Sequence, residues 1–210
     1  DMLDVAFMGL HVAQMTHPAE MTRCFDMVTN ANAKIMNLDG YGLKVGSFVA
    51  PIWGGAGGGS AMGDKDDVKR FLSQVEKACR IGQQMREIGI RPTGGIRVDS
   101  STGVEAWDAD PAGNTRKIAD TFREAGKIAK DHGERLAAEG EICWAGMHSW
   151  KNMVNLLEEV AMPKVVGFQA DMSHTHLYIL GANAEQHRIV PKDFHWEPGA
   201  FHQAMTKLTK

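Results

Sequence analysis

Several features that would indicate particular classes of protein are scarce or missing in this sequence. The 210 residues include only three cysteines, Cys24, Cys79 and Cys143, and no two of them form a CxxC pair. An odd, widely spaced set of this kind predicts neither a disulfide framework nor a zinc-thiolate site. No stretch approaches the roughly 18 consecutive apolar residues that a membrane-spanning helix needs. We therefore expect a protein with reduced cysteines that does not cross a membrane.

Positive charge is also not in excess. The formal net charge is -3, and lysine and arginine are scattered among aspartate and glutamate without a basic stripe. Such a surface is a poor match for nucleic acid. The first residues show no basic region followed by an apolar run, so no signal peptide is indicated. The expectation is a cytoplasmic protein whose partner is a small molecule, with a homo-oligomer as an open possibility.

Short β-branched runs alternate along the chain with amphipathic helical patterns. The runs predict six strands, at residues 4–9, 35–38, 43–51, 94–99, 135–142 and 164–171. Helices are predicted from Pro18 onward and at residues 64–88, 115–130, 152–160 and 200–208. Strict alternation of strand and helix indicates βα units around a parallel sheet, and this regularity is typical of a (β/α) barrel.

The number of strands sets a second expectation about the domain. A (β/α)8 TIM barrel usually takes about 250 residues, and no clear strand follows Asp171. We therefore expect residues 1–210 to form a single α/β barrel domain that lacks its last strands in this chain. The alternative is a six-stranded open α/β sheet.

Polar residues mark the ends of the last predicted strands. Glu139 and Glu141 are two residues apart, so their side chains share one face of a strand, and the adjacent strand ends at Asp171. Burying these carboxylates unpaired would cost several kcal/mol each. A divalent metal ion (Mn, Mg, Co or Zn) would compensate them. The alternative is that Asp171 caps the following turn while the glutamates pair with Arg97 or Arg135.

These motifs resemble a known family. RLAAEGE, followed by a helix and KVVGFQADMSH, resembles the strand-five and strand-six signatures of the xylose isomerase-like sugar isomerase/epimerase family, L-x-x-E and then D-x-x-H. YGLKVGSFVAP resembles the third strand of that family, and the likeness extends over residues 30–176. The resemblance implies a glutamate that binds metal and moves protons, at Glu139 or Glu141. It also implies a second metal ligand at Asp171 and a substrate-contacting histidine at His174.

Other residues take roles under the same reading. Trp53 and Trp144 are expected to stack on a sugar ring, with packing under loops as the alternative, and His148 is expected to donate a hydrogen bond to the substrate. Residues 99–114 exceed a usual βα loop and are read as a substrate-covering loop. The family takes two further metal ligands, a histidine and a glutamate, from strands seven and eight. The only downstream candidates here are His195, Glu197 and His202, in a segment that does not read as a strand.

The expected function is therefore a metal-dependent isomerase or epimerase that abstracts a proton next to the carbonyl of a sugar or keto-sugar. A keto-glycoside lyase or hydratase would begin with the same carbanion, so the sequence does not separate these reactions. A metal-dependent hydrolase on the same barrel and a non-catalytic sugar-binding barrel are the remaining alternatives.

Overall fold

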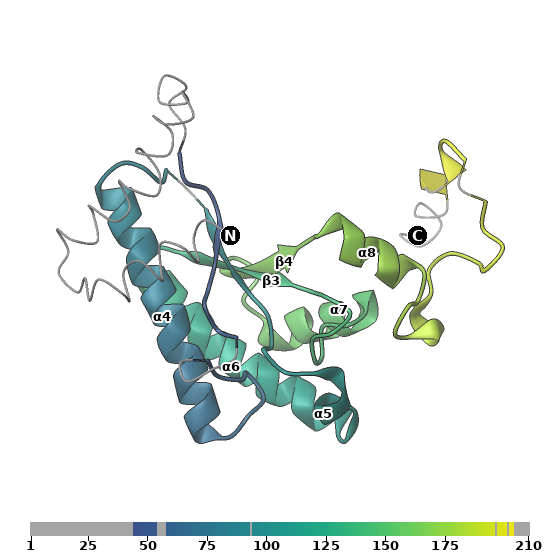
Figure 1. Cartoon of the computed structure of the whole chain (residues 1–210), viewed down its shortest axis with the longest axis horizontal. Coiled ribbons are helices and arrows are strands. Elements are labelled where there is room, and N and C mark those ends of the chain that lie inside the picture. Colours follow the sequence, from purple (N-terminus) through teal and green to yellow (C-terminus); the bar gives the residue numbers. More distant parts are fainter. Residues whose placement is uncertain (1–43, 54–57, 93, 196, 201, 204–210) are drawn as a thin grey trace.

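A parallel four-stranded sheet forms the centre of the molecule (Figure 1). The computed structural model describes residues 44–53, 58–92, 94–195, 197–200 and 202–203. The strands lie in the order of the chain: β1 (Phe48–Val49), β2 (Gly95–Val98), β3 (Arg135–Glu139) and β4 (Val166–Gln169). All three pairings are parallel, with Val98 opposite Ala138 and Glu139 opposite Gln169. Sequential parallel order requires a crossover between each pair of strands, and helices supply it.

The helices that make these crossovers cover one side of the sheet (Figure 1). They are α4 (Lys65–Glu87), α5 (Val104–Asp108), α6 (Pro111–Asp131) and α7 (Trp150–Val160), and α6 packs against both α4 and α7. After β4 the chain forms α8 (Met172–Ile179) and the 3-10 turn η3 (Glu185–His187). Side chains cap the helices: Asp64 accepts hydrogen bonds from the first turn of α4, and Ser149 accepts one at the start of α7.

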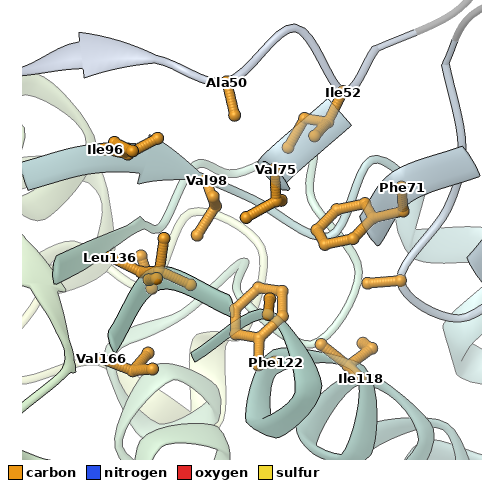
Figure 2. Packing of buried hydrophobic residues seen from close by; sticks show 14 of the residues in the cluster. Ala50, Ile52, Phe71, Val75, Ile96, Val98, Ile118, Phe122, Leu136 and Val166 are labelled. Atoms are coloured by element: carbon orange, nitrogen blue, oxygen red, sulfur yellow. The ribbon is translucent and has the colours of Figure 1, made fainter. Parts of the chain in front are cut away.

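The hydrophobic core lies between this helical layer and the sheet (Figure 2). Ile96 and Val98 of β2 are fully buried there, and Phe71 of α4 stacks near Phe122 of α6 with ring centroids 6.1 Å apart. Side chains alternate between the two faces of a strand. Arg97 lies between Ile96 and Val98 in sequence, so its side chain lies on the face opposite this core.

At the amino-terminal ends of the strands, a buried ion pair joins three segments. The Arg91 Nη1 donates to Glu134 Oε1 at 2.5 Å, and both side chains are inaccessible to solvent. Arg91 also donates through Nε to the carbonyl of Gly46 at 2.9 Å and through Nη2 to that of Gly95 at 3.3 Å. The Arg91–Glu134 pair therefore fixes the segment before β1 against the beginnings of β2 and β3.

The predicted elements of the described region are largely confirmed, with shorter strands than expected. Residues 94–99, 135–142 and 164–171 contain β2, β3 and β4, whereas only two residues of 43–51 pair as β1. The helix predicted at 64–88 is α4, and that at 152–160 is α7 with two more residues at its start. The predicted strand at 135–142 ends at Glu139 because the chain turns after Gly140.

The interpretation of residues 99–114 as a loop was wrong in part. Val104–Asp108 is helical, and α6 begins at Pro111, four residues before the predicted start. Asp110 caps this helix and Pro111 occupies its first turn, a signal that the apolar spacing alone does not contain. Trp107 is buried, and its Nε1 donates to Thr115 Oγ1 at 3.0 Å. The segment is thus a packed helical connection.

The strands predicted at residues 4–9 and 35–38 and the helix predicted from Pro18 lie outside the described residues, as does most of the helix predicted at 200–208. Within the described part of the chain, none of the helices has the length and apolarity needed to cross a bilayer.

Candidate active site

Arg97 lies at the centre of a group of acidic side chains at the carboxyl end of the sheet. Its Nη1 donates to Asp99 Oδ2, its Nε to Glu139 Oε2 and its Nη2 to Glu141 Oε1. We call these four residues the Arg97 cluster. Arg97 and Asp99 are almost inaccessible to solvent, whereas the Glu141 side chain is 23% exposed. The cluster is therefore anchored in the protein and opens toward solvent on the Glu141 side.

The electrostatics of the Arg97 cluster favour a proton or a second cation. One guanidinium faces three carboxyl groups, so negative charge exceeds positive charge when all three are ionised. Burial raises the pKa of Asp99 to about 6, although the Arg97 charge and the hydrogen bonds from Trp53 and Ser101 oppose this shift. The neighbouring Glu141 raises the Asp99 pKa a little further.

The two glutamates differ in how their second oxygen is used. Glu139 Oε1 accepts a hydrogen bond from Gln169 Nε2 at 2.8 Å, so protein donors bind both of its oxygens. Glu141 Oε2 instead accepts a hydrogen bond from Cys143 Sγ at 3.5 Å and lies 3.7 Å from His174 Nε2. Glu141 is thus the glutamate with an oxygen directed toward the start of α8.

Asp171 is the N-cap of α8. Its Oδ1 accepts hydrogen bonds from the backbone of Ser173 at 2.8 Å and His174 at 3.1 Å, and these bonds lower the pKa of Asp171. Both contacts that the sequence offered as alternatives to a metal are therefore observed: Asp171 caps the following helix, and the glutamates pair with Arg97. Asp171 and His174 belong to the same helical turn, which lies beside Glu141.

The donor groups fit one side of a metal site. Carboxylate oxygens of Glu141 and Asp171 and an imidazole nitrogen suit Mn, Mg, Co or Zn. The Nδ1 of His174 is buried and has no hydrogen-bond partner in the described part of the chain. Within the same described ranges, no three His, Cys, Asp or Glu side chains are grouped closely enough to hold an ion by themselves. His195, Glu197 and His202 do not lie in a strand.

Two indole rings lie next to the Arg97 cluster. Trp53 Nε1 donates to Asp99 Oδ2 at 2.6 Å, and the Arg97 guanidinium lies 4.8 Å from the Trp53 ring centroid. The rings of Trp53 and Trp144 are nearly parallel: their planes differ by 2°, and their centroids are 6.5 Å apart. Trp53 is 43% exposed. Trp53 is therefore a partly exposed aromatic side chain beside the carboxylates, and its stacking on a sugar ring stays a prediction.

His148 has a different environment from the other predicted substrate contacts. It is 5% exposed, its ring lies edge-on to Trp107 at 4.9 Å, and its Nε2 accepts from Asn152 Nδ2 at 2.9 Å. Burial lowers the pKa of His148. The structure does not bring His148 to the exposed face of Trp53, and its substrate contact stays a prediction.

Three members of the site were not assigned a role from sequence. Arg97 was considered only as an ion-pair partner of the glutamates, Asp99 only as a polar residue at a strand end, and Gln169 was not singled out. The available signal is spacing: Arg97 and Asp99, like Gln169 and Asp171, are two residues apart at a strand end and so share a face.

The family assignment follows from a comparison with protein-family models. The model described as xylose isomerase-like TIM barrel matches residues 18–203, and the chain belongs to this family. A comparison with functionally curated proteins finds no match.

Two solved structures are similar to the chain at low sequence identity. A xylose isomerase domain protein from Alicyclobacillus acidocaldarius is 15% identical with a TM-score of 0.46, over 75% of this chain and 53% of that one. The 3-keto-D-glucoside 4-epimerase YcjR from E. coli, in its apo form, is 18% identical with a TM-score of 0.49, over 91% of this chain and 72% of that one. The chain thus spans about half the length of the first of these proteins.

Proposed function

We propose that the protein is an isomerase or epimerase that abstracts a proton next to the carbonyl of a sugar or keto-sugar. The observation that supports this best is the Arg97 cluster: Glu139 at the end of β3 and Glu141 two residues beyond it both pair with Arg97, at the carboxyl end of a parallel sheet and beside the exposed Trp53. Carboxylates at this end of a parallel α/β sheet are placed where such folds react with their substrates.

Glu141 is the group that we assign to proton transfer. Its side chain is partly exposed, and its Oε2 lies beside the start of α8 and accepts from the weak donor Cys143 Sγ. Both Glu139 oxygens instead accept from nitrogen donors, of Arg97 and Gln169. His174, 3.7 Å from that oxygen, would bind a substrate hydroxyl. The exposed face of Trp53 would stack on the sugar ring and keep the reacting carbon near Glu141.

A divalent metal ion (Mn, Mg, Co or Zn), held by Asp171 and by Glu139 or Glu141, would polarise the carbonyl and adjacent hydroxyl oxygens when bound. Arg97 contributes separately as a buried guanidinium that donates hydrogen bonds to both glutamates.

The first test is proton exchange in D2O. The purified protein, supplied with Mn2+, is mixed with methyl 3-keto-β-D-glucopyranoside, whose carbonyl acidifies the neighbouring C–H bonds, and deuterium incorporation is followed by NMR. We expect exchange, and loss of about 10²- to 10⁴-fold in rate for Glu141→Gln, the usual contribution of a general base. Glu158→Gln, an exposed glutamate on α7, is the matched control and should leave the rate unchanged.

The products separate the reactions that share this first step. An inverted or rearranged sugar indicates epimerase or isomerase activity, and loss of the glycosidic group or of water indicates a lyase. Exchange that is unaffected by Glu139→Gln and Glu141→Gln would contradict the assignment of the Arg97 cluster as the catalytic group.

Metal content is the second test, and it addresses a non-catalytic sugar-binding barrel. Elemental analysis should find about one divalent ion per chain after loading, with loss of that ion in Asp171→Asn. Comparing Glu139→Gln with Glu141→Gln in the same measurement identifies the glutamate ligand. A protein that binds sugar, retains no metal and exchanges no proton would support the binding role instead.

A further inference from the structure

We propose that Arg97 is a positioning residue that fixes the catalytic glutamates and the aromatic platform Trp53 in one arrangement. The proposal rests on the function proposed above, because it concerns the same site. It assigns to Arg97 a role beyond charge balance: the guanidinium determines where Glu139, Glu141 and Trp53 lie relative to one another.

The geometry of the guanidinium supports this role. All three of its nitrogen atoms are used, and each donates to a different carboxylate, on two different strand ends. A planar guanidinium holds its partners in fixed directions, whereas a lysine ammonium is a single point charge on a flexible stem. Arg97 is 4% exposed, so water has little access to the guanidinium itself.

Trp53 depends on the same group in two ways. The guanidinium lies against its ring, at 4.8 Å from the centroid, and Asp99, which Arg97 holds, accepts the indole N–H at 2.6 Å. Trp53 is nonetheless 43% exposed, and its other ring contact is with Trp144, at 6.5 Å between centroids. Removing the Arg97 guanidinium should therefore release both the glutamates and the platform.

The buried Arg91 provides an internal comparison. It is similarly buried, pairs with a glutamate and lies over an aromatic ring, that of Phe48, but its other hydrogen-bond acceptors are the backbone carbonyls of Gly46 and Gly95 at the opposite end of the sheet. Arg91 has no contact with the Arg97 cluster in the described part of the chain. If Arg97 were only a structural residue, its substitution should lower stability without changing the environment of Trp53, as we expect for Arg91.

The test compares Arg97→Lys and Arg97→Gln with Arg91→Lys. The indole N–H resonance of Trp53, assigned with Trp53→Phe in 15N-tryptophan-labelled protein, reports the hydrogen bond to Asp99 without any need for activity. We expect both Arg97 variants to shift this resonance upfield. Arg91→Lys should leave it in place while lowering the melting temperature.

Kinetics then test the catalytic consequence. Displacement of a reacting group by about 1 Å can cost 10²-fold in rate, so the D2O exchange rate at saturating substrate should fall by about that factor in Arg97→Lys. KM should change less than kcat, and added ethylguanidinium should restore part of the rate in Arg97→Gln. The Arg91→Lys rate per folded molecule should equal that of the unmodified protein.

The outcomes distinguish this proposal from the proposed function. If the unmodified protein exchanges no proton, the proposed function is contradicted. The Trp53 resonance still decides whether Arg97 positions Trp53 and Asp99. An unchanged resonance and rate in Arg97→Lys overturn the positioning role. So does unfolding of both Arg97 variants under conditions where Arg91→Lys is folded, since Arg97 would then be a structural residue.

Discussion

Asp99 combines complete burial with three hydrogen-bond donors: the Arg97 guanidinium, the Trp53 indole and the Ser101 backbone. Its pKa is nevertheless raised to about 6, because loss of hydration outweighs these partners. At a pH between these two values, the folded protein therefore holds a proton on Asp99 that the unfolded chain, with an Asp99 pKa near 3.8, has already released.

The pH dependence of stability follows from this difference. Between pH 4 and pH 6 the folded state binds more protons at Asp99 than the unfolded state, so this group contributes stability that is lost as pH rises through its folded pKa. We expect the contribution of Asp99 to the free energy of unfolding to fall across this range. Urea unfolding measured at several pH values checks it.

Asp99→Asn is the comparison variant for that experiment. It keeps an acceptor for the Trp53 indole but cannot ionise, so the difference in unfolding free energy between the two proteins should change across pH 4 to 6. Parallel pH curves for the two proteins would show that Asp99 is already ionised at pH 4 in the folded state.

Gly140 separates the two glutamates and lies in a tight space. A β-carbon at this position would lie 2.9 Å from the Met147 carbonyl oxygen and would also contact the Tyr178 hydroxyl. Because overpacking displaces the backbone, Gly140→Ala should cost about 1–3 kcal/mol of unfolding free energy and should shift Glu139 and Glu141. A reduced D2O exchange rate in the folded variant is the expected result.

Gly167 on β4 offers a matched control for this substitution. A β-carbon there meets no atom within 4 Å, so Gly167→Ala should change neither stability nor exchange by a comparable amount. Equal effects at the two glycines would show that the space around Gly140 does not set the glutamate positions.

At the level of single elements, the start of α7 depends on Ser149. Its side chain accepts the backbone N–H of Asn152 at 3.2 Å and bonds to His187 Nδ1 at 2.8 Å, which joins the helix to η3. Ser149→Ala should lower the free energy of unfolding by about 1 kcal/mol, the usual cost of a lost N-cap. Ser149→Asn keeps a capping acceptor and should recover most of that loss in chemical denaturation.

The sequence predicts the elements around the core well because burial dictates their pattern. α4 follows from its apolar stripe, confirmed at Val75 and Cys79, and β2 from the buried Ile96 and Val98. The site is less predictable. Glu139, Glu141 and Asp171 were selected by their place at strand ends, but the contact of one guanidinium with three carboxylates depends on rotamers and on the register between β2 and β3.

Elements without a hydrophobic period were missed. α8 contains MSHTHLYI, of which only Tyr178 and Ile179 are buried, so it shows no apolar stripe that would predict a helix. α5 is five residues long, and its burial rests on the single side chain of Trp107. Helices this short form because their neighbours hold them, and local propensity does not reveal that.

For the molecule as a whole, stability should depend on the Arg91–Glu134 pair at the end of the sheet opposite the Arg97 cluster. Arg91→Met removes a buried charge from a buried partner and leaves the carbonyls of Gly46 and Gly95 without their donor. Breaking one side of a buried ion pair costs about 3–5 kcal/mol. We expect a loss toward the lower value, because Arg86 also pairs with Glu134.

Denaturant unfolding of Arg91→Met and of the double variant Arg91→Met, Glu134→Leu measures this contribution. The double variant should be more stable than the single one, since it removes the buried carboxylate that Arg86 alone would otherwise balance. If the single variant loses less than about 1 kcal/mol of unfolding free energy, the value typical of an exposed ion pair, then burial of Arg91 does not strengthen its contribution to stability.

The alternation of side chains along the strands has a consequence for how this sequence can diverge. Arg97 and Glu139 lie on the face opposite the core because they alternate along β2 and β3 with the buried Ile96, Val98, Leu136 and Ala138. Deleting a single codon from β2 or β3 would turn Arg97 or Glu139 into the hydrophobic layer and send Ile96 or Leu136 to the opposite face. Length variation among related genes should therefore fall in the connections between strands and helices, and the strands should change only by substitution.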